Sequence, residues 1–395
     1  MSAPDQRASR WLFIADSGVV FAGAPGGDCQ SATFPQVCVT REERWLCAFR
    51  AAPQKASNAG QRVLLTHSDD CGASWGEPIE PFPPTPIDGR PGRIRIAALT
   101  ALDNGQLLAV VNWVDDSNPS LPYFNEETEG LLDTRILLSF SGDWGMTWSP
   151  LRVIDTTPFN VPTPLTGPVL KLSAGDLACQ FEINKPYDNP APWRHASVML
   201  FSKDGGRTWP EYAVVAQDPS NRVFYWDQRP SVLPGGRILD VFWTFDRVDA
   251  RYLNIHARES LDSGRHWSEL WDTGVPGQPG PPFQLGDGAI AMPYVDRKGA
   301  PMMKVRRSRD AGRTWPSDQE LVVHTASGGS QTRSKSSMQD AWAEMYKFSV
   351  GLPSAAALPD GGGLILYYAG PETDVTSIRW AVVRLLSSEI TGQIE

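Results

Sequence analysis

The sequence predicts an all-β protein, a six-bladed β-propeller, and three observations lead to that prediction. A turn motif with the pattern S-x-D-x-G-x-[TSH]-W occurs five times, an apolar–turn–apolar pattern occurs six times, and helix signals are nearly absent. The five motifs occupy residues 68–75, 141–148, 202–209, 260–267 and 308–315. A short unit repeated along a chain is typical of an architecture built from equivalent modules.

Each copy of the motif is expected to form a tight turn between two strands. Its Asp and Ser can bond backbone amides of the turn, its Gly supplies a positive φ, and its Trp can pack between neighbouring sheets. These residues therefore indicate the fold, and we do not expect them to form the active site.

The second pattern predicts a hairpin ahead of each turn motif, since an apolar run, a polar or glycine turn and another apolar run form two paired strands. It covers residues 37–49, 98–110, 170–178, 232–242, 284–292 and 355–366. In the first five units a strand, the turn motif and another strand follow, which makes four antiparallel strands. The sixth unit lacks the motif. Its last strand is expected at 378–385, and residues 11–21 are expected to supply its outer strand and close the ring.

Antiparallel connectivity sorts the loops onto two faces. The glycine turns and the turn motifs share one face, and the longer loops occupy the other, at residues 76–93, 114–134, 210–226 and 316–348. A binding site is expected on this loop-rich face near the axis, where first strands begin and second strands end.

Composition fits one large domain that spans residues 1–395, because a repeat architecture overrides the domain count that length alone would suggest. The formal net charge of −9 argues against a nucleic-acid partner. No apolar run is long enough to predict a signal peptide or a membrane span. The five cysteines are scattered, so we expect reduced thiols and a cytoplasmic protein.

The turn motif is identified as the Asp-box, or BNR repeat, and the chain resembles the sialidase (neuraminidase) superfamily over nearly its whole length. Sialidases begin a blade with Arg-Ile-Pro-Ala-Leu, whose Arg binds the substrate carboxylate, and Arg95-Ile-Ala-Ala-Leu99 is similar to that sequence. The resemblance implies that the family's acid/base Asp corresponds to Asp115 or Asp116. It places the family's Glu position at Asp227.

The resemblance also implies further arginines around the substrate. Arg247 and Arg297 are the nearest candidates, and Arg50 and Arg229 face the same region. Three further candidates for the site are then a carboxylate, Glu182, and two aromatic residues, Trp226 and Tyr346.

The nucleophile departs from the family pattern. Sialidases use a Tyr at the start of the first strand of the final blade, because a neutral phenol can approach an anomeric carbon that bears a carboxylate. This chain has Val350-Gly-Leu-Pro-Ser354 there. Tyr346, in the preceding loop, reaches the axis only if that loop folds inward.

We therefore expect a sialidase-like, exo-acting glycoside hydrolase that releases a terminal acidic sugar from a glycan or glycoconjugate, by either a retaining or an inverting route. No cofactor is expected, and the five His residues show no metal-ligand spacing. Two alternatives remain open, a non-catalytic carbohydrate-binding propeller and a lyase directed at uronates. The sequence does not indicate the sugar or the oligomeric state.

Overall fold

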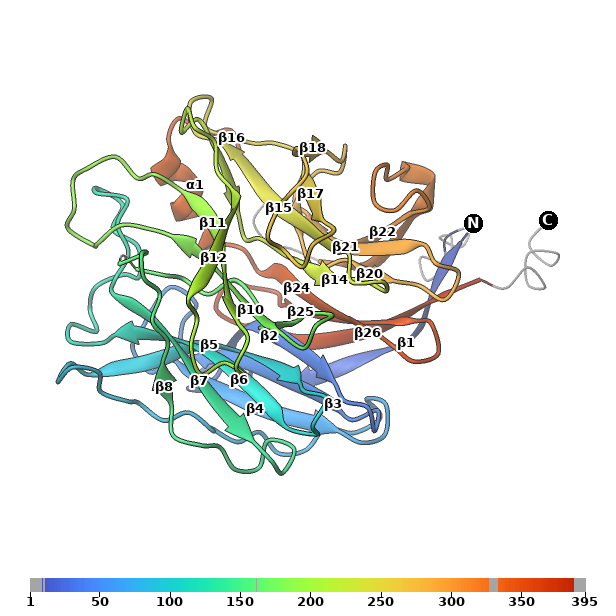
Figure 1. The fold of residues 1–395 in the computed structure, drawn as a ribbon, viewed down its shortest axis with the longest axis horizontal. Coiled ribbons are helices and arrows are strands. Elements are labelled where there is room, and N and C mark those ends of the chain that lie inside the picture. Colours follow the sequence, from blue (N-terminus) through green and yellow to red (C-terminus); the bar gives the residue numbers. More distant parts are fainter. Residues whose placement is uncertain (1–8, 10, 161, 327–332, 387–395) are drawn as a thin grey trace.

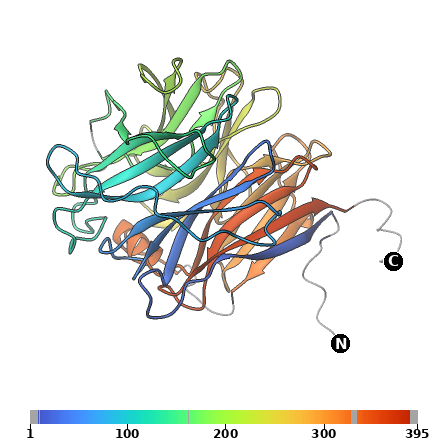
Figure 2. The same cartoon turned by 90° about the horizontal axis from the view of Figure 1, so that it is seen from below.

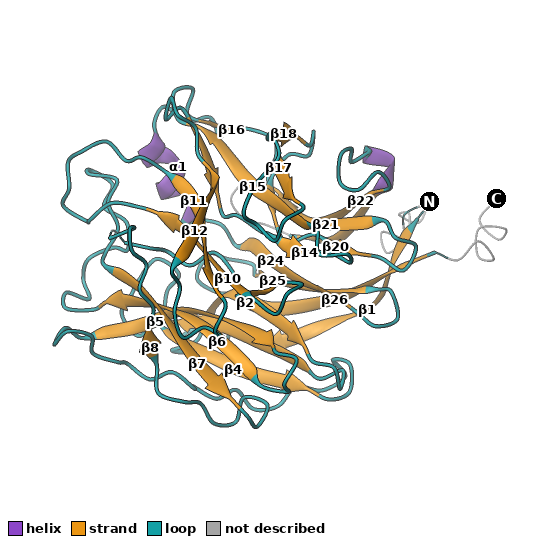
Figure 3. Cartoon of the chain, in the orientation of Figure 1, coloured by secondary structure: helices purple, strands orange, loops and turns teal. Residues whose placement is uncertain are grey.

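The protein is seen in a computed structural model that describes residues 9, 11–160, 162–326 and 333–386. Six antiparallel sheets form the blades of a ring, which confirms the predicted six-bladed β-propeller (Figure 1). Within these ranges, helix is confined to a 3-10 turn at Ser317–Gln319 and to α1 at Met338–Met345 (Figure 3).

The first three blades follow the chain in order. The first contains β2 (Ser31–Val39), β3 (Trp45–Ala52) and β4 (Arg62–Ser68). The second contains β5 (Gly92–Ala101), β6 (Leu107–Asp115), β7 (Thr134–Ser141) and β8 (Arg152–Val153). The third contains β9 (Leu170–Lys171), β10 (Leu177–Ile183), β11 (Ala196–Ser202) and β12 (Glu211–Ala216).

The next two blades have interrupted inner strands. The fourth contains β13 (Val223–Trp226), β14 (Ser231–Val232), β15 (Ile238–Asp246), β16 (Arg251–Tyr252), β17 (His256–Ser260) and β18 (Trp271–Asp272). The fifth contains β19 (Gln278–Pro279), β20 (Phe283–Gln284), β21 (Ile290–Asp296), β22 (Met302–Ser308) and β23 (Glu320–Thr325). The inner strand of the fourth blade is split into β13 and β14, which both pair with β15. That of the fifth blade is split into β19 and β20, which both pair with β21.

The sixth blade joins the two ends of the described chain. It contains β24 (Val350–Ala357), β25 (Gly363–Ala369), β26 (Ser377–Leu385) and β1 (Leu12–Phe21). The antiparallel pairing of β1 with β26 runs from Leu12 opposite Leu385 to Phe21 opposite Ile378. These two strands lie side by side in both views of the ring (Figure 1, Figure 2). The prediction that the N-terminal strand completes the sixth blade is confirmed.

The Asp-box turns have the hydrogen bonds that the motif predicts. In the box at residues 202–209, the hydroxyl of Ser202 donates to Asp204 at 2.8 Å and accepts the amide of Gly206 at 2.8 Å. Asp204 in turn accepts the amide of Thr208 at 2.9 Å. Gly206 has a φ of +84°, a conformation that glycine adopts without steric cost.

The Asp-box tryptophans were expected to be largely buried, and the structure divides them into two groups. Trp209 and Trp315 are buried, whereas Trp75, Trp148 and Trp267 are half-buried. None of the five lines the central cavity described below. Their role is therefore to pack the outer part of the ring.

Two stretches that were predicted as loops contain regular structure. Residues 210–226 hold β12 and β13, and residues 316–348 hold β23 and α1, with 327–332 lying outside the described residues. β12 alternates exposed and buried side chains, as an edge strand packed on one face does. No helix in the described ranges is long and apolar enough to cross a membrane.

Candidate functional site

A central cavity of about 200 Å³ lies where the blades converge, and all six contribute to its wall. The inner ends of the blades supply Gln36, Arg95, Glu182, Asp227, Gln278 and Tyr368. The segment that contains α1 adds Trp342, Met345 and Tyr346. This is the axial position at which the sequence predicts a binding site.

Arg95 reaches the cavity from β5 and is 7% exposed. Its guanidinium donates to the side-chain oxygens of Asn58 and Gln61, both at 3.2 Å, and lies 4.3 Å from the centre of the Tyr123 ring. Gln61 also accepts from Arg50 at 2.8 Å. Arg50 therefore supports Arg95 from behind and does not itself line the cavity.

Lys55 brings a further positive charge to the wall of the cavity and is 5% exposed. Its amine donates to the backbone carbonyls of Met345 and Phe348, at 2.9 and 2.5 Å. Burial lowers the pKa of Lys55 well below its ordinary value, and the positive charges of Arg297 and Arg50 lower that pKa further.

Four buried cations thus surround one side of the cavity, namely Arg50, Lys55, Arg95 and Arg297. None of them forms an ion pair with a carboxylate of the described residues, and their partners are amide and carbonyl oxygens. A buried charge is costly unless an opposite charge compensates it. The arrangement therefore favours an anionic ligand.

Two carboxylates lie on the wall of the same cavity. Glu182, near the end of β10, accepts the backbone amide of Asp227. Asp227 follows β13 and has a φ of +50°, a conformation uncommon for a non-glycine residue. Such backbone strain is typical of functional sites.

Each carboxylate has a basic or amide side chain nearby. Asp227 accepts from the Gln278 amide at 2.7 Å and lies 3.4 Å from the guanidinium of Arg229. The other oxygen of Glu182 lies 3.6 Å from Nε2 of His195, whose side chain is buried. The pair can act as proton donor and acceptor toward a bound molecule.

The loop before the sixth blade folds inward and carries Tyr346 to the cavity. Ser337 caps α1 by accepting the amide of Asp340, and Trp342 stacks on Phe124 with ring centres 3.9 Å apart. Burial raises the pKa of Tyr346, and the charge of Arg95 lowers it. The sequence predicts that Tyr346 reaches the axis only if its loop folds inward, and the loop does so.

The other predicted carboxylates lie elsewhere. Asp115 pairs with Arg90 at 2.8 Å and Asp116 pairs with Arg93 at 2.5 Å, and neither lines the central cavity. Asp115 ends β6 opposite Gly92, at the start of β5, so both carboxylates meet the arginines of the preceding loop and strand. The structure does not bring them together with Asp227.

Of the other residues predicted for the site, some line the central cavity and some do not. Arg229 and Trp226 line the central cavity, whereas Arg247 pairs with Glu129 at 2.9 Å and does not. Arg297 lies just behind the wall, where it donates to Gln278 at 2.9 Å.

Lys55 and Gln278 were missed by sequence reasoning, because neither stands in a motif. Gln278 follows Gly277, whose φ is +105° and whose missing Cβ would lie 2.2 Å from the carbonyl oxygen of Val295. A glycine in such a conformation just before a short inner strand is the signal that could have marked this position. Across the described residues, His, Cys, Asp and Glu form no group of three that could hold a metal ion.

Residues 121–317 match the BNR repeat-like domain family. No curated protein matches the chain. Among solved structures, a protein of unknown function from Dyadobacter fermentans DSM 18053 is 19% identical, with a TM-score of 0.71 over 95% of this chain and 99% of that chain.

Two sugar-processing proteins share the fold at lower identity. A variant of the NanB sialidase from Streptococcus pneumoniae is 12% identical, with a TM-score of 0.60 over 93% of this chain and 71% of that chain. An α-L-arabinanase from Penicillium chrysogenum, complexed with arabinobiose, is 15% identical, with a TM-score of 0.61 over 93% of this chain and 98% of that chain. These similarities show that the chain has the β-propeller fold that sialidases also have, and that residues 121–317 resemble a BNR repeat-like domain.

Proposed function

We propose that this protein is a glycoside hydrolase that releases a terminal acidic sugar from a glycan. The observation that carries the proposal is the arrangement at one central cavity, where Arg95 and Lys55 line the wall together with Glu182, Asp227 and Tyr346. Arg50 and Arg297 lie just behind this wall. Cations select an acidic sugar, and the two carboxyl groups supply the acid and base that hydrolysis of a glycosidic bond needs.

Recognition begins with the carboxylate of the sugar. Arg95 and Lys55 face the cavity and bind this group by charge-assisted hydrogen bonds, while Arg50 and Arg297 add positive potential from behind. The indole rings of Trp226, Trp243 and Trp342 offer the apolar surface that sugar rings prefer.

Bond cleavage then uses the carboxyl pair. One of the two carboxyl groups acts as the general acid. That group protonates the leaving oxygen as the bond to the anomeric carbon breaks. The other accepts a proton from the attacking water, whose oxygen forms the new bond. If Tyr346 attacks first, the second carboxylate takes the phenol proton, and the phenol oxygen replaces the leaving oxygen on the anomeric carbon. Water then hydrolyses this covalent intermediate and the configuration is retained.

A second candidate function is binding of an acidic glycan without catalysis. It is favoured by the full engagement of Asp227, whose oxygens face Gln278 and Arg229, since a carboxylate held in this way can be purely structural. Under this alternative the cations would still bind the acidic sugar, and the two carboxyl groups would not act as acid and base.

Aryl glycosides of sialic and uronic acids test the proposal, with an aryl α-L-arabinofuranoside as the neutral control. We expect turnover of at least one acidic substrate, lost in Asp227→Asn, and none of the neutral one. Acidic sugars that bind measurably but are never turned over would decide for the binding function. Turnover of the neutral glycoside alone would refute the acidic specificity.

A further inference from the structure

A second cavity, of about 430 Å³, lies beside the central one, between the loops of the fourth and fifth blades and the segment that precedes α1. Trp243 contributes to the walls of both cavities. Tyr252, Arg297, Lys298 and Arg333 also contribute to the wall of the second cavity. The two cavities are therefore adjacent and share the Trp243 side chain as a wall.

The second cavity is positively charged in a protein whose formal net charge is −9. Five cationic side chains line it, together with two acidic ones. The cations are Arg251, Arg297, Lys298, Arg333 and Lys335.

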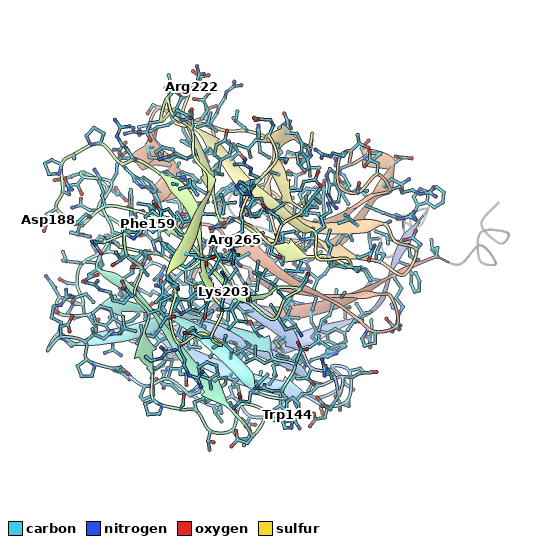
Figure 4. The ribbon with its side chains drawn as sticks, in the orientation of Figure 1. Trp144, Phe159, Asp188, Lys203, Arg222 and Arg265 are labelled. Carbon is cyan, nitrogen blue, oxygen red and sulfur yellow. The ribbon has the colours of Figure 1, made fainter. Side chains whose placement is uncertain are left out.

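Both acids form ion pairs, and one of them, Asp249, pairs with Arg251 of this cavity at 3.6 Å. Asp249 also pairs with Arg222 at 2.9 Å. Arg222 is labelled at the upper edge of the molecule in Figure 4. Asp296 pairs with Lys304 at 3.0 Å. In contrast, Lys298 and Arg333 form no ion pair with any residue that the structure describes.

Arg297 connects the two cavities. Its side chain is 4% exposed, and one terminal nitrogen donates to Gln278, which in turn donates to Asp227. Its Nε is buried and has no hydrogen-bond partner among the described residues. A buried donor left without an acceptor is costly, and the positive charge of Arg297, which lines the second cavity, favours an anion there.

We propose that the second cavity binds an anionic group, a carboxylate or a sulfate, on the next sugar of the glycan whose terminal acidic sugar occupies the central cavity. This inference rests on the proposed function and narrows it to glycans with two consecutive acidic sugars. Lys298 and Arg333 bind the second anion from the open side, and Arg297 does so from the buried side.

Calorimetry with matched sugars tests the proposal at low salt. N-acetylneuraminic acid is compared with α2,8-linked disialic acid, galacturonic acid with digalacturonic acid, and glucuronic acid with a heparin-derived disaccharide sulfated on its second sugar. For the type of glycan that the protein prefers, the disaccharide with the second anion should bind about tenfold more tightly than the monosaccharide, as a charge-assisted contact predicts. Which pair shows the gain distinguishes carboxylate from sulfate.

The double variant Lys298→Ala/Arg333→Ala should lose that gain and bind the monosaccharide as the wild type does. Lys203→Ala is the matched control, since Lys203 is exposed and lies in an Asp-box turn (labelled in Figure 4). No gain from a second anion, or a gain that survives in the double variant, would overturn the inference.

Inorganic sulfate separates this inference from the proposed function. In an Arg95→Ala/Lys55→Met background, which lacks the central anion site, saturable sulfate binding should remain and should disappear on addition of Lys298→Ala/Arg333→Ala. If no acidic monosaccharide binds the wild type, the proposed function fails. The sulfate titration then still decides whether the second cavity binds anions.

Discussion

The side chain of Glu182 accepts a hydrogen bond from the backbone amide of Asp227, and both residues line the central cavity from neighbouring blades. Asp227 follows β13 and Glu182 lies near the end of β10. Under the proposed function these two side chains supply the acid and the base of the cavity.

Replacing Arg95 should weaken binding of an acidic sugar. Arg95→Ala removes a guanidinium from the cavity wall, which should cost about 1.5–3 kcal/mol of binding free energy, the usual value of a charge-assisted contact. Arg93→Ala is the matched control, because Arg93 lies on the same strand but pairs with Asp116. Calorimetry on both folded variants checks the prediction, and equal affinities would contradict it.

Replacing either carboxyl of the pair should abolish proton transfer and keep the fold. Asp227→Asn and Glu182→Gln should each lower kcat on an acidic aryl glycoside by about 10²–10⁴. Asp116→Asn serves as a control outside the cavity and should retain activity. If Asp116→Asn lost as much rate as Asp227→Asn, the acid–base assignment would move to the loop after β6.

Removing the hydroxyl of Tyr346 distinguishes the two routes of hydrolysis. Tyr346→Phe should lower kcat by less than about tenfold if water attacks the anomeric carbon directly, and by about as much as Asp227→Asn if the phenol attacks first. NMR of the released sugar supplies an independent readout, since direct attack by water inverts the configuration and attack by the phenol retains it. A large loss of rate together with inversion would exclude Tyr346 as the nucleophile.

Binding of the acidic sugar should be coupled to proton uptake at Lys55. Burial holds the pKa of free Lys55 well below its ordinary value, and a bound anion raises that pKa again. The coupling makes affinity highest below the free-state pKa, and affinity falls as pH rises from there through the pKa of the bound state. Calorimetry in phosphate and in Tris should show different heats, and Lys55→Met should remove the difference. Equal heats for the wild type would refute the coupling.

Acid should destabilise the protein through its Asp-box turns. The side chain and amide of Ser74 hold the pKa of Asp70 at about 2, and Thr147 does the same for Asp143. Both folded-state pKa values lie below the unfolded-state value of about 4. The stabilisation of the folded state by these two carboxylates is therefore complete above about pH 4 and is lost as pH falls through about 2. The Tm should drop over this range, and drop less in Asp143→Asn. Parallel Tm curves for the wild type and this variant would contradict the prediction.

The fold could be predicted because its signals are local. An Asp-box such as residues 202–209 contains the donor, the acceptor and the glycine of its own turn, so eight residues suffice to recognise it. The hairpins are likewise short-range, and six of them determine the number of blades. The closing strand β1 followed from counting strands.

The composition of the site could be predicted only in part, because it depends on contacts between distant residues. Asp115 and Asp116 lie near the axis by strand counting, yet Arg90 and Arg93 bind them outside the central cavity. Lys55 belongs to the cavity because its amine bonds to carbonyls nearly 300 residues later in the chain. No local pattern encodes such a contact.

The pairing of β1 with β26 has a consequence for synthesis on the ribosome. β1 emerges before the five intervening blades, and its partner β26 becomes available only after them. Until then β1 is an unpaired edge, the kind of surface that a chaperone protects from aggregation. A nascent chain stalled before residue 377 would also hold Arg95 and Asp227 in a ring that cannot close. The capacity to bind a ligand should therefore appear abruptly, once β26 has been translated, and not grow blade by blade.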